Sequence, residues 1–102
     1  MEQYIAVREY ELNTNEKVTI YIYKPFLDKE DYCCNFRITG FSNNIESYVI
    51  GSDGIQAIFL VLMKIGTILY TSEEYKHEKL TLFESLDLDL PYPESIADIV
   101  KK

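Results

Sequence analysis

The spacing of hydrophobic residues changes at Gly51, and this change constrains the fold more than any other feature of the chain. Before Gly51, apolar residues alternate with polar ones, and the stretch from Lys17 to Lys24 is the clearest case. After Gly51, apolar residues recur with a period of about 3.6, which is typical of a helix. Strands followed by a helix predict an α+β fold.

Four stretches before Gly51 have the composition of strands. They are rich in β-branched and aromatic residues, and Asn-rich turns, charged residues or Pro25 separate them. The predicted strands are Tyr4–Leu12, Lys17–Lys24, Tyr32–Thr39 and Ile45–Ile50. We therefore predict a four-stranded antiparallel meander, with one long helix packed on one of its faces.

The predicted helix begins after Ser52, which stands where an N-cap would accept hydrogen bonds from the first-turn amides, and continues to Thr71. Its apolar arc is too wide for one sheet face to bury, so we expect the C-terminal third or a second subunit to cover its flank. Gly66 inside the helix predicts that another backbone passes close by.

The residues after Thr71 predict smaller elements. The even spacing of Leu80, Leu82 and Leu86 suggests a short strand or an extended packing segment, and Glu94–Lys101 can form a short terminal helix. Because 102 residues suffice for only one core, residues 1–102 are predicted to form a single domain.

The charge of the chain argues against two classes of partner. Seventeen acidic and ten basic residues give a formal net charge of −7. This field repels phosphate backbones and anionic lipids, so we expect neither a nucleic-acid nor a membrane partner. The charge suits a basic protein partner, and solubility alone is the alternative explanation. The apolar stretch Ile55–Tyr70 contains Gln56 and Lys64 and is too short and polar for a membrane span.

Cys33 and Cys34 are adjacent, and neighbours on a strand point to opposite faces, so we expect two free thiols. We expect no secretory leader, and two adjacent cysteines do not make a disulfide framework. The expected compartment is therefore a reducing cytoplasm.

Tyrosine is unusually frequent, with nine Tyr and no Trp. If the helix covers the apolar face of the sheet, the opposite face displays Tyr and Arg, which are enriched in protein-binding hot spots. The residues predicted to bind a partner are Arg8, Tyr10, Tyr21, Tyr23 and Arg37, with Tyr4 beside them. The alternative is a solvated face on which Tyr merely pairs across strands.

No group of residues predicts catalysis, a cofactor or a metal. His77, the only histidine, lies in a charged run without other residues at metal-ligand spacing. Cys34 alternates onto the apolar face, which argues against a nucleophile that uses His77 as its base. The stretch 51–54 could present amides to an anion, but a helix N-cap accounts for all of its residues.

Two motifs carry a resemblance. Arg37-Ile38-Thr39-Gly40 closes a predicted strand, and Gly51-Ser52-Asp53-Gly54-Ile55-Gln56-Ala57-Ile58 starts the predicted helix, followed by Ile65-Gly66. Over roughly residues 5–70 the chain resembles a family of small uncharacterised bacterial domains. The resemblance implies a bacterial α+β domain and adds no chemistry.

The leading functional hypothesis is a non-enzymatic interaction domain that binds a basic protein partner, as small toxin-neutralising proteins do. The alternative is a small-ligand-binding or enzymatic domain with a pocket near the helix N-terminus, between Gly51 and Gln56. A third hypothesis is self-association as a homodimer through the helix flank and the terminal segment.

Overall fold

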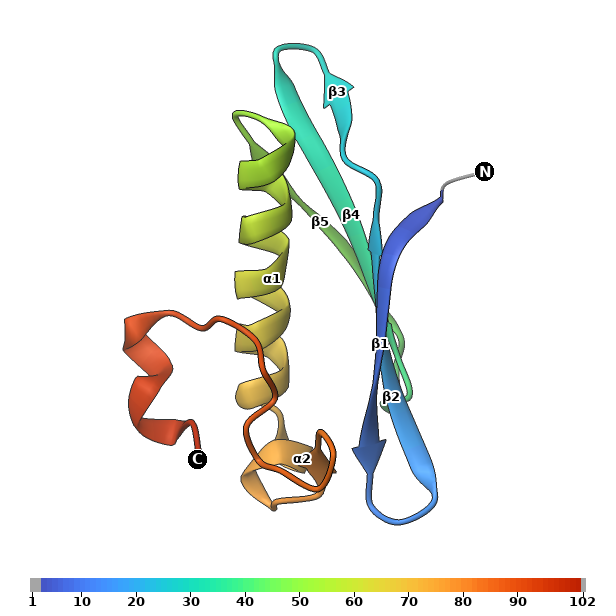
Figure 1. Cartoon of the computed structure of the whole chain (residues 1–102), viewed down its shortest axis with the longest axis vertical. Helices are drawn as coiled ribbons and strands as arrows, with labels where there is room; N and C mark the ends of the chain where they lie inside the picture. Colours follow the sequence, from blue (N-terminus) through green and yellow to red (C-terminus); the bar gives the residue numbers. More distant parts are fainter. Residues whose placement is uncertain (1–2, 102) are drawn as a thin grey trace.

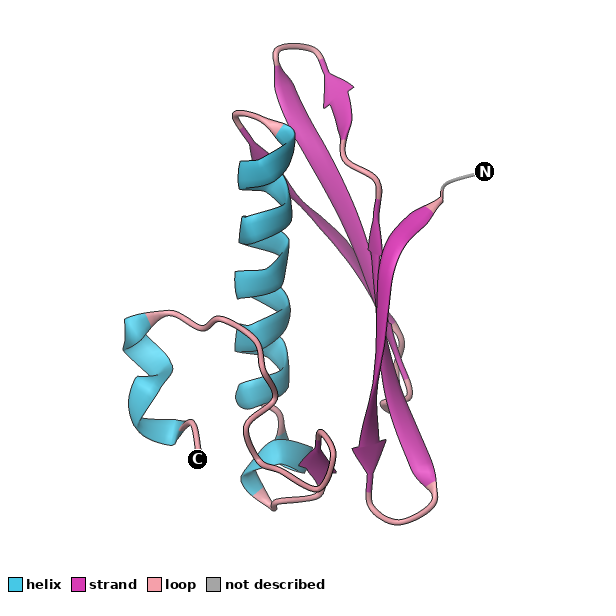
Figure 2. Cartoon of the chain, viewed as in Figure 1, coloured by secondary structure: helices cyan, strands magenta, loops and turns pink. Residues whose placement is uncertain are grey.

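A twisted antiparallel sheet and one long helix make up the computed structural model, which describes residues 3–101 (Figure 1). The strands are β1 (Tyr4–Leu12), β2 (Glu16–Tyr23), β3 (Phe26–Asp28), β4 (Asp31–Thr39), β5 (Ile45–Gly51) and β6 (Leu80–Thr81). The helices are α1 (Gly54–Tyr70), α2 (Glu73–Lys76) and the 3-10 helix η1 (Glu94–Ile99). The prediction of an α+β fold with one main helix is confirmed (Figure 2).

The described sheet has six strands, so the predicted count of four is wrong. The four predicted strands are present as β1, β2, β4 and β5, and each pairs antiparallel with the next. Pro25 cannot donate a ladder hydrogen bond and ends β2, after which β3 pairs with the start of β4. The short β6 comes from the C-terminal third and pairs with the end of β1.

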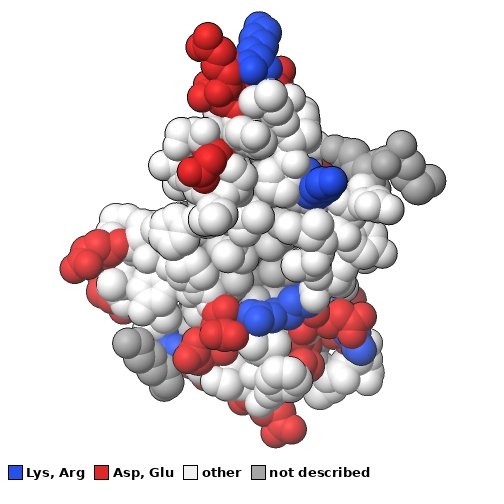
Figure 3. Space-filling view, turned by 45° about the horizontal axis from the view of Figure 1, so that its top comes forward, with Lys and Arg blue, Asp and Glu red and all other residues white. Residues whose placement is uncertain are grey.

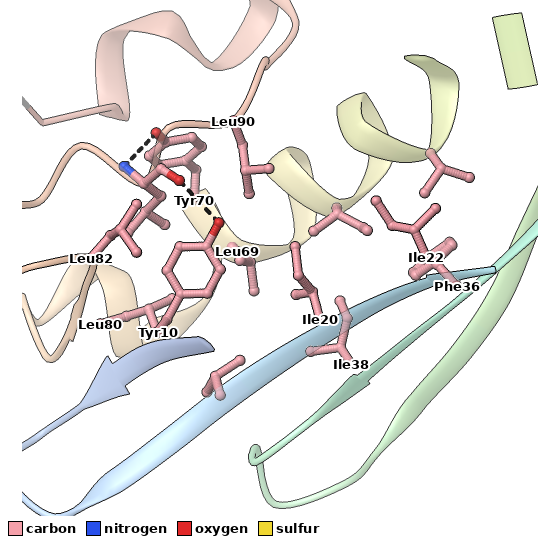
Figure 4. Close-up of a cluster of buried hydrophobic side chains, with 14 of the residues drawn as sticks. Tyr10, Ile20, Ile22, Phe36, Ile38, Leu69, Tyr70, Leu80, Leu82 and Leu90 are labelled. Atoms are coloured by element: carbon pink, nitrogen blue, oxygen red, sulfur yellow. Dashed lines mark hydrogen bonds between the residues drawn. The ribbon is translucent and has the colours of Figure 1, made fainter. Parts of the chain in front are cut away.

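One face of the sheet packs against α1, as the alternation in β2 and β4 predicts. Directly opposite residues of an antiparallel pair share a face. Ile20 lies opposite Ile38, and Ile22 lies opposite Phe36. All four are buried in the core with Val61 and Leu69 of α1. Figure 4 shows this cluster between the helix and the strands.

The start of α1 is capped one residue later than predicted. Asp53, not Ser52, is the N-cap, and its Oδ1 accepts a hydrogen bond from the Gln56 amide at 2.8 Å. The Gln56 side chain reaches back and accepts from the Ser52 amide at 2.6 Å. This reciprocal arrangement resembles a capping box, in which the third helical residue satisfies an amide before the helix.

The C-terminal third covers one flank of α1, which confirms the first of the two predicted ways to bury it. The chain passes from β6 along the helix before it reaches η1 (Figure 1), and Leu88 and Leu90 are buried. A Cβ atom on Gly66 would collide with the carbonyl oxygen of Pro91. The close backbone approach predicted at Gly66 is therefore present.

The outer side of α1 stays uncovered near its N-terminus, where Ile55 is 82% and Phe59 is 53% exposed. No helix among residues 3–101 combines the length and apolar character needed to cross a membrane.

Candidate protein-interaction face

The face of the sheet turned away from α1 carries two rows of side chains that run across the strands. In one row Val7 lies opposite Tyr21, Tyr21 opposite Arg37, and Arg37 opposite Glu46. In the other, Tyr4 lies opposite Tyr23 and Asn35 opposite Tyr48. We call this surface the open face; it comprises Tyr4, Val7, Tyr21, Tyr23, Asn35, Arg37, Glu46 and Tyr48.

Four residues of the open face, Tyr4, Tyr21, Tyr23 and Arg37, form one contiguous cluster. The Tyr4 ring centroid lies 5.3 Å from that of Tyr21 and 6.0 Å from that of Tyr23, both in edge-to-face arrangements. The Arg37 guanidinium carbon lies 5.9 Å from the Tyr21 ring centroid. Such contacts hold each ring in a defined orientation while its edge stays accessible.

Arg37 keeps unused donor capacity. Among residues 3–101, the ion pairs are made by Arg8, Lys17, Lys76 and Lys101, and Arg37 is not one of these cations. Its Nε atom is buried and has no hydrogen-bond partner within the described part of the chain. Because the Nε is buried, only the outer guanidinium nitrogens can offer donors to a carboxylate or carbonyl of a bound molecule.

A shallow hollow of about 200 Å³ adjoins the cluster between two of the tyrosines. Tyr23 and Tyr48 line it together with Asn35 and Glu46. The hollow combines aromatic walls with amide and carboxylate groups, which is the composition of many protein-binding surfaces.

The prediction placed Arg8 and Tyr10 on the open face, and this placement is wrong. Arg8 lies opposite Ile20 and Tyr10 opposite Val18, so both point toward α1. A register shift between Tyr4 and Ala6, typical of a β-bulge, moves Tyr4 to the other face. The simple alternation of strand one therefore fails at this shift. Of the predicted binding residues, Tyr21, Tyr23 and Arg37 lie on the open face, with Tyr4 beside them.

Three tyrosines on the opposite side hold the C-terminal segment through their hydroxyl groups. The Tyr10 hydroxyl donates to the Leu88 carbonyl at 3.0 Å, and the Leu88 amide donates to the Tyr70 hydroxyl at 2.9 Å (Figure 4). The Tyr75 hydroxyl donates to the Leu86 carbonyl at 2.9 Å and accepts from the Lys101 amide at 2.6 Å. Part of the tyrosine excess therefore serves the core.

Arg8 strengthens the same attachment. Its guanidinium donates to the Asp89 carbonyl at 2.9 Å and pairs with the Asp89 carboxylate at 3.3 Å. Because both side chains of this pair are partly exposed, the ion pair itself contributes little stability. Its role is to position the segment over β1.

Burial of these tyrosines predicts a loss of stability in alkali. Burial raises the pKa of Tyr70 from 10.0 to about 12 and the pKa of Cys34 from 9.0 to about 11. The unfolded chain therefore releases protons at lower pH than the folded chain, so stability falls as pH rises through this window. The free energy of unfolding should stay level below about pH 9 and fall between pH 9 and 12, with about 2 kcal/mol from Tyr70.

Urea denaturation at a series of pH values measures this effect. In the Tyr70→Phe variant the fall between pH 10 and 12 should be smaller by about 2 kcal/mol, because the titrating group is gone. An identical slope in both proteins would contradict the assignment.

The residues considered for chemistry lie apart from the open face. Cys34 is fully buried and its Sγ donates to the Tyr23 carbonyl at 3.3 Å, while His77 is exposed and its Nδ1 lies 2.9 Å from the Glu73 carbonyl oxygen. Cys33, next to Cys34 in the sequence, is buried as well. Within residues 3–101, no group of three His, Cys, Asp or Glu residues is arranged to hold a metal ion.

Two further cavities adjoin β1, one of about 220 Å³ on the helix side and one of about 400 Å³ beside β6. Neither these nor the open-face hollow has a lining residue between Gly51 and Gln56. The cavities described among residues 3–101 thus give no support to a pocket at the start of α1.

Comparison with known proteins places the chain in a family. A family model described as "Domain of unknown function (DUF6968)" matches residues 6–92. The chain belongs to the DUF6968 family. No curated protein and no solved structure matches it.

The DUF6968 match reaches further along the chain than the resemblance over residues 5–70. It continues to Tyr92 and thus includes the segment that the buried tyrosines hold. The family match therefore covers the sheet from Ala6 onward, which leaves Tyr4 of the open face outside it, and the segment that covers α1 as far as Tyr92.

Proposed function

We propose that this DUF6968 domain is a non-enzymatic interaction module that binds a protein partner through its open face. The observation that carries the proposal is the contiguous cluster of Tyr4, Tyr21, Tyr23 and Arg37 on a sheet face that no other described element covers. Tyrosine and arginine dominate binding hot spots because they combine large contact area with directional polar groups.

The exposed tyrosines at the ends of the open face support a role in binding rather than a role in packing within the domain. Tyr4 is 55% and Tyr48 is 56% exposed at two ends of the open face, although both are large aromatic residues. An edge-to-face array of this kind loses little side-chain entropy on binding, because neighbouring rings already restrict each rotamer.

The net charge of −7 supports a basic partner, as in toxin-neutralising proteins. We place this binding in the cytoplasm of a bacterial cell, a compartment in which the thiols of Cys33 and Cys34 stay reduced.

Substitutions in the cluster test the proposal. Partners recovered from the native host with the wild-type domain should be purified and titrated against Tyr21→Ala and Arg37→Ala. Each substitution should weaken binding by about 30-fold, the effect of a hot-spot loss of about 2 kcal/mol. Phe59→Ala is the matched control, because Phe59 is an exposed aromatic on α1, away from the open face.

Circular dichroism and urea denaturation of each variant separate a binding effect from unfolding. Unchanged affinity in both cluster variants, or an equal loss in Phe59→Ala, would remove the open face as the binding surface.

A further inference from the structure

The outer edge of β1 is only partly paired. β2 occupies one edge of β1 along its length, while β6 pairs with the other edge only at Glu11 and Leu12. Between Ala6 and Tyr10 no strand lies on that outer side among residues 3–101 (Figure 1). Unpaired backbone groups on an edge strand form a template for another strand. We call the stretch Ala6–Tyr10 the free edge.

The chain turns away where β6 could have continued along this edge. After Thr81, Leu82 and Ser85 exchange two backbone hydrogen bonds of 2.9 Å, and Phe83 and Glu84 between them have positive φ values of 50° and 66°. This tight turn ends the ladder after two residue pairs. The Phe83 side chain is 86% exposed beside the stretch that remains unpaired.

An apolar cavity opens on the helix side of the same free edge. Its volume is about 220 Å³, and Ile20, Ile22, Leu62 and Leu90 line it with Ala6 of β1 itself. The paired Arg8 and Asp89 also belong to its lining. A strand added to β1 would run about 4.8 Å away. Its side chains opposite Ala6 and Arg8 would point to the helix side, because directly opposite residues share a face. A side chain of the added strand at one of these positions would therefore lie at the mouth of the cavity.

The charges around the free edge favour a basic strand. The two nearby cations are already paired, Arg8 with Asp89 and Lys17 with Glu9. The acidic residues near the edge outnumber them; they are Glu9, Glu11, Glu84 and Asp89. Figure 3 shows acidic side chains gathered around a few basic ones in the lower half of this surface.

We propose that the free edge of β1 accepts an extended, basic segment of a partner protein as an additional strand, with one apolar side chain seated in the cavity beneath it. Backbone pairing supplies affinity, and the cavity and the excess of acidic residues around the edge supply selectivity. A second copy of this chain fits less well, because each copy carries a net charge of −7. This site is separate from the cluster of the open face and stands whether or not that face binds a protein.

Three synthetic peptides serve as probes for this site. One alternates Lys with Val and Leu, the second has Glu in place of Lys, and the third keeps every Lys but has Pro in place of two apolar residues. Amide hydrogen exchange of the domain is measured with each peptide at moderate salt. We expect the first peptide alone to slow exchange within Ala6–Tyr10, since proline prevents strand pairing and the acidic peptide is repelled.

Two substitutions locate the site further. Glu9→Lys should weaken binding of the basic peptide about fivefold. Glu46→Lys makes the same charge change on the far side of the open face, and the affinity for the peptide should then stay within about twofold of the wild type. Ala6→Phe, which fills the cavity, should weaken binding of the basic peptide about tenfold. Circular dichroism checks that this variant is folded. Tyr21→Ala should have no effect on this peptide, which separates the site from the open-face cluster.

Four outcomes would overturn the proposal. They are equal protection by the proline peptide, protection on β5 in place of β1, equal effects of the two Glu substitutions, and protection of the free edge that rises with protein concentration alone. The last result would assign the edge to a homodimer, which sedimentation would detect.

Discussion

Replacing Tyr70 by alanine should lower the free energy of unfolding by about 3–5 kcal/mol, the usual cost of removing a buried aromatic side chain. The Tyr70 ring is fully buried and contacts two other rings, with centroids 5.0 Å from Tyr75 and 5.4 Å from Tyr92. Its hydroxyl accepts a hydrogen bond of 2.9 Å from the Leu88 amide. Since domains of this size are stable by about 5–15 kcal/mol, this loss is a large share of the total.

The Tyr70→Phe variant divides this effect into its parts. It keeps the ring but leaves the Leu88 amide without its acceptor, so about 1–2 kcal/mol should be lost. Urea denaturation measures both values, and Tyr48→Ala on the open face is the control, with an expected change within about 0.5 kcal/mol. A loss in Tyr70→Ala no larger than that control would show that the ring does not join the C-terminal segment to the core.

Adding a single methyl group at Gly66 should destabilise the domain by about 1–3 kcal/mol, even though alanine is the better helix former. The reason is steric, because the new Cβ would meet the Pro91 carbonyl oxygen. The segment must move away from α1 to relieve this contact. Faster amide exchange at Leu88 and Leu90 in Gly66→Ala should accompany the loss of stability.

Gly54→Ala is the matched control for this substitution. Gly54 is also in α1, but the nearest atom to its Cβ would be Pro25 Cβ at 3.8 Å, an ordinary van der Waals contact. This variant should be as stable as the wild type or up to about 1 kcal/mol more stable. Opposite signs at the two glycines support the close approach at Pro91, and equal stabilisation at both would contradict it.

The hydrophobic alternation of the long strands and the residue pattern of α1 made most of the fold predictable. The alternation in β2 and β4 placed Ile20 and Ile38 on the helix side and Tyr21 and Arg37 on the other, and the pairing confirms this. Gly66 indicated a passing backbone because a glycine inside a helix is costly unless space is needed. The short strand β3 was missed, since three residues carry no measurable period. The spacing from Leu80 to Leu86 did suggest a short strand or an extended packing segment, and β6 occupies Leu80–Thr81.

The candidate site was only partly predictable because it depends on register. Arg8, Tyr10 and Tyr4 have the same parity in strand one, and only the shift between Tyr4 and Ala6 divides them between two faces. No local signal in Tyr4–Ala6 marks this shift. The residue type of Tyr10 did not decide its burial either. Tyrosine suits both a solvent-exposed surface and a buried position that offers a hydrogen-bond acceptor to its hydroxyl.

The contacts at Leu88 bear on when the chain can complete its fold during synthesis. Tyr10 is made long before Leu88, the residue whose carbonyl accepts a hydrogen bond from the Tyr10 hydroxyl. The flank of α1 stays bare until the stretch around Leu88 has left the ribosome, so the core closes only after most of this domain has been synthesised. Until then the nascent chain exposes apolar helix and sheet surfaces, and chaperones that shield such surfaces would protect it from aggregation.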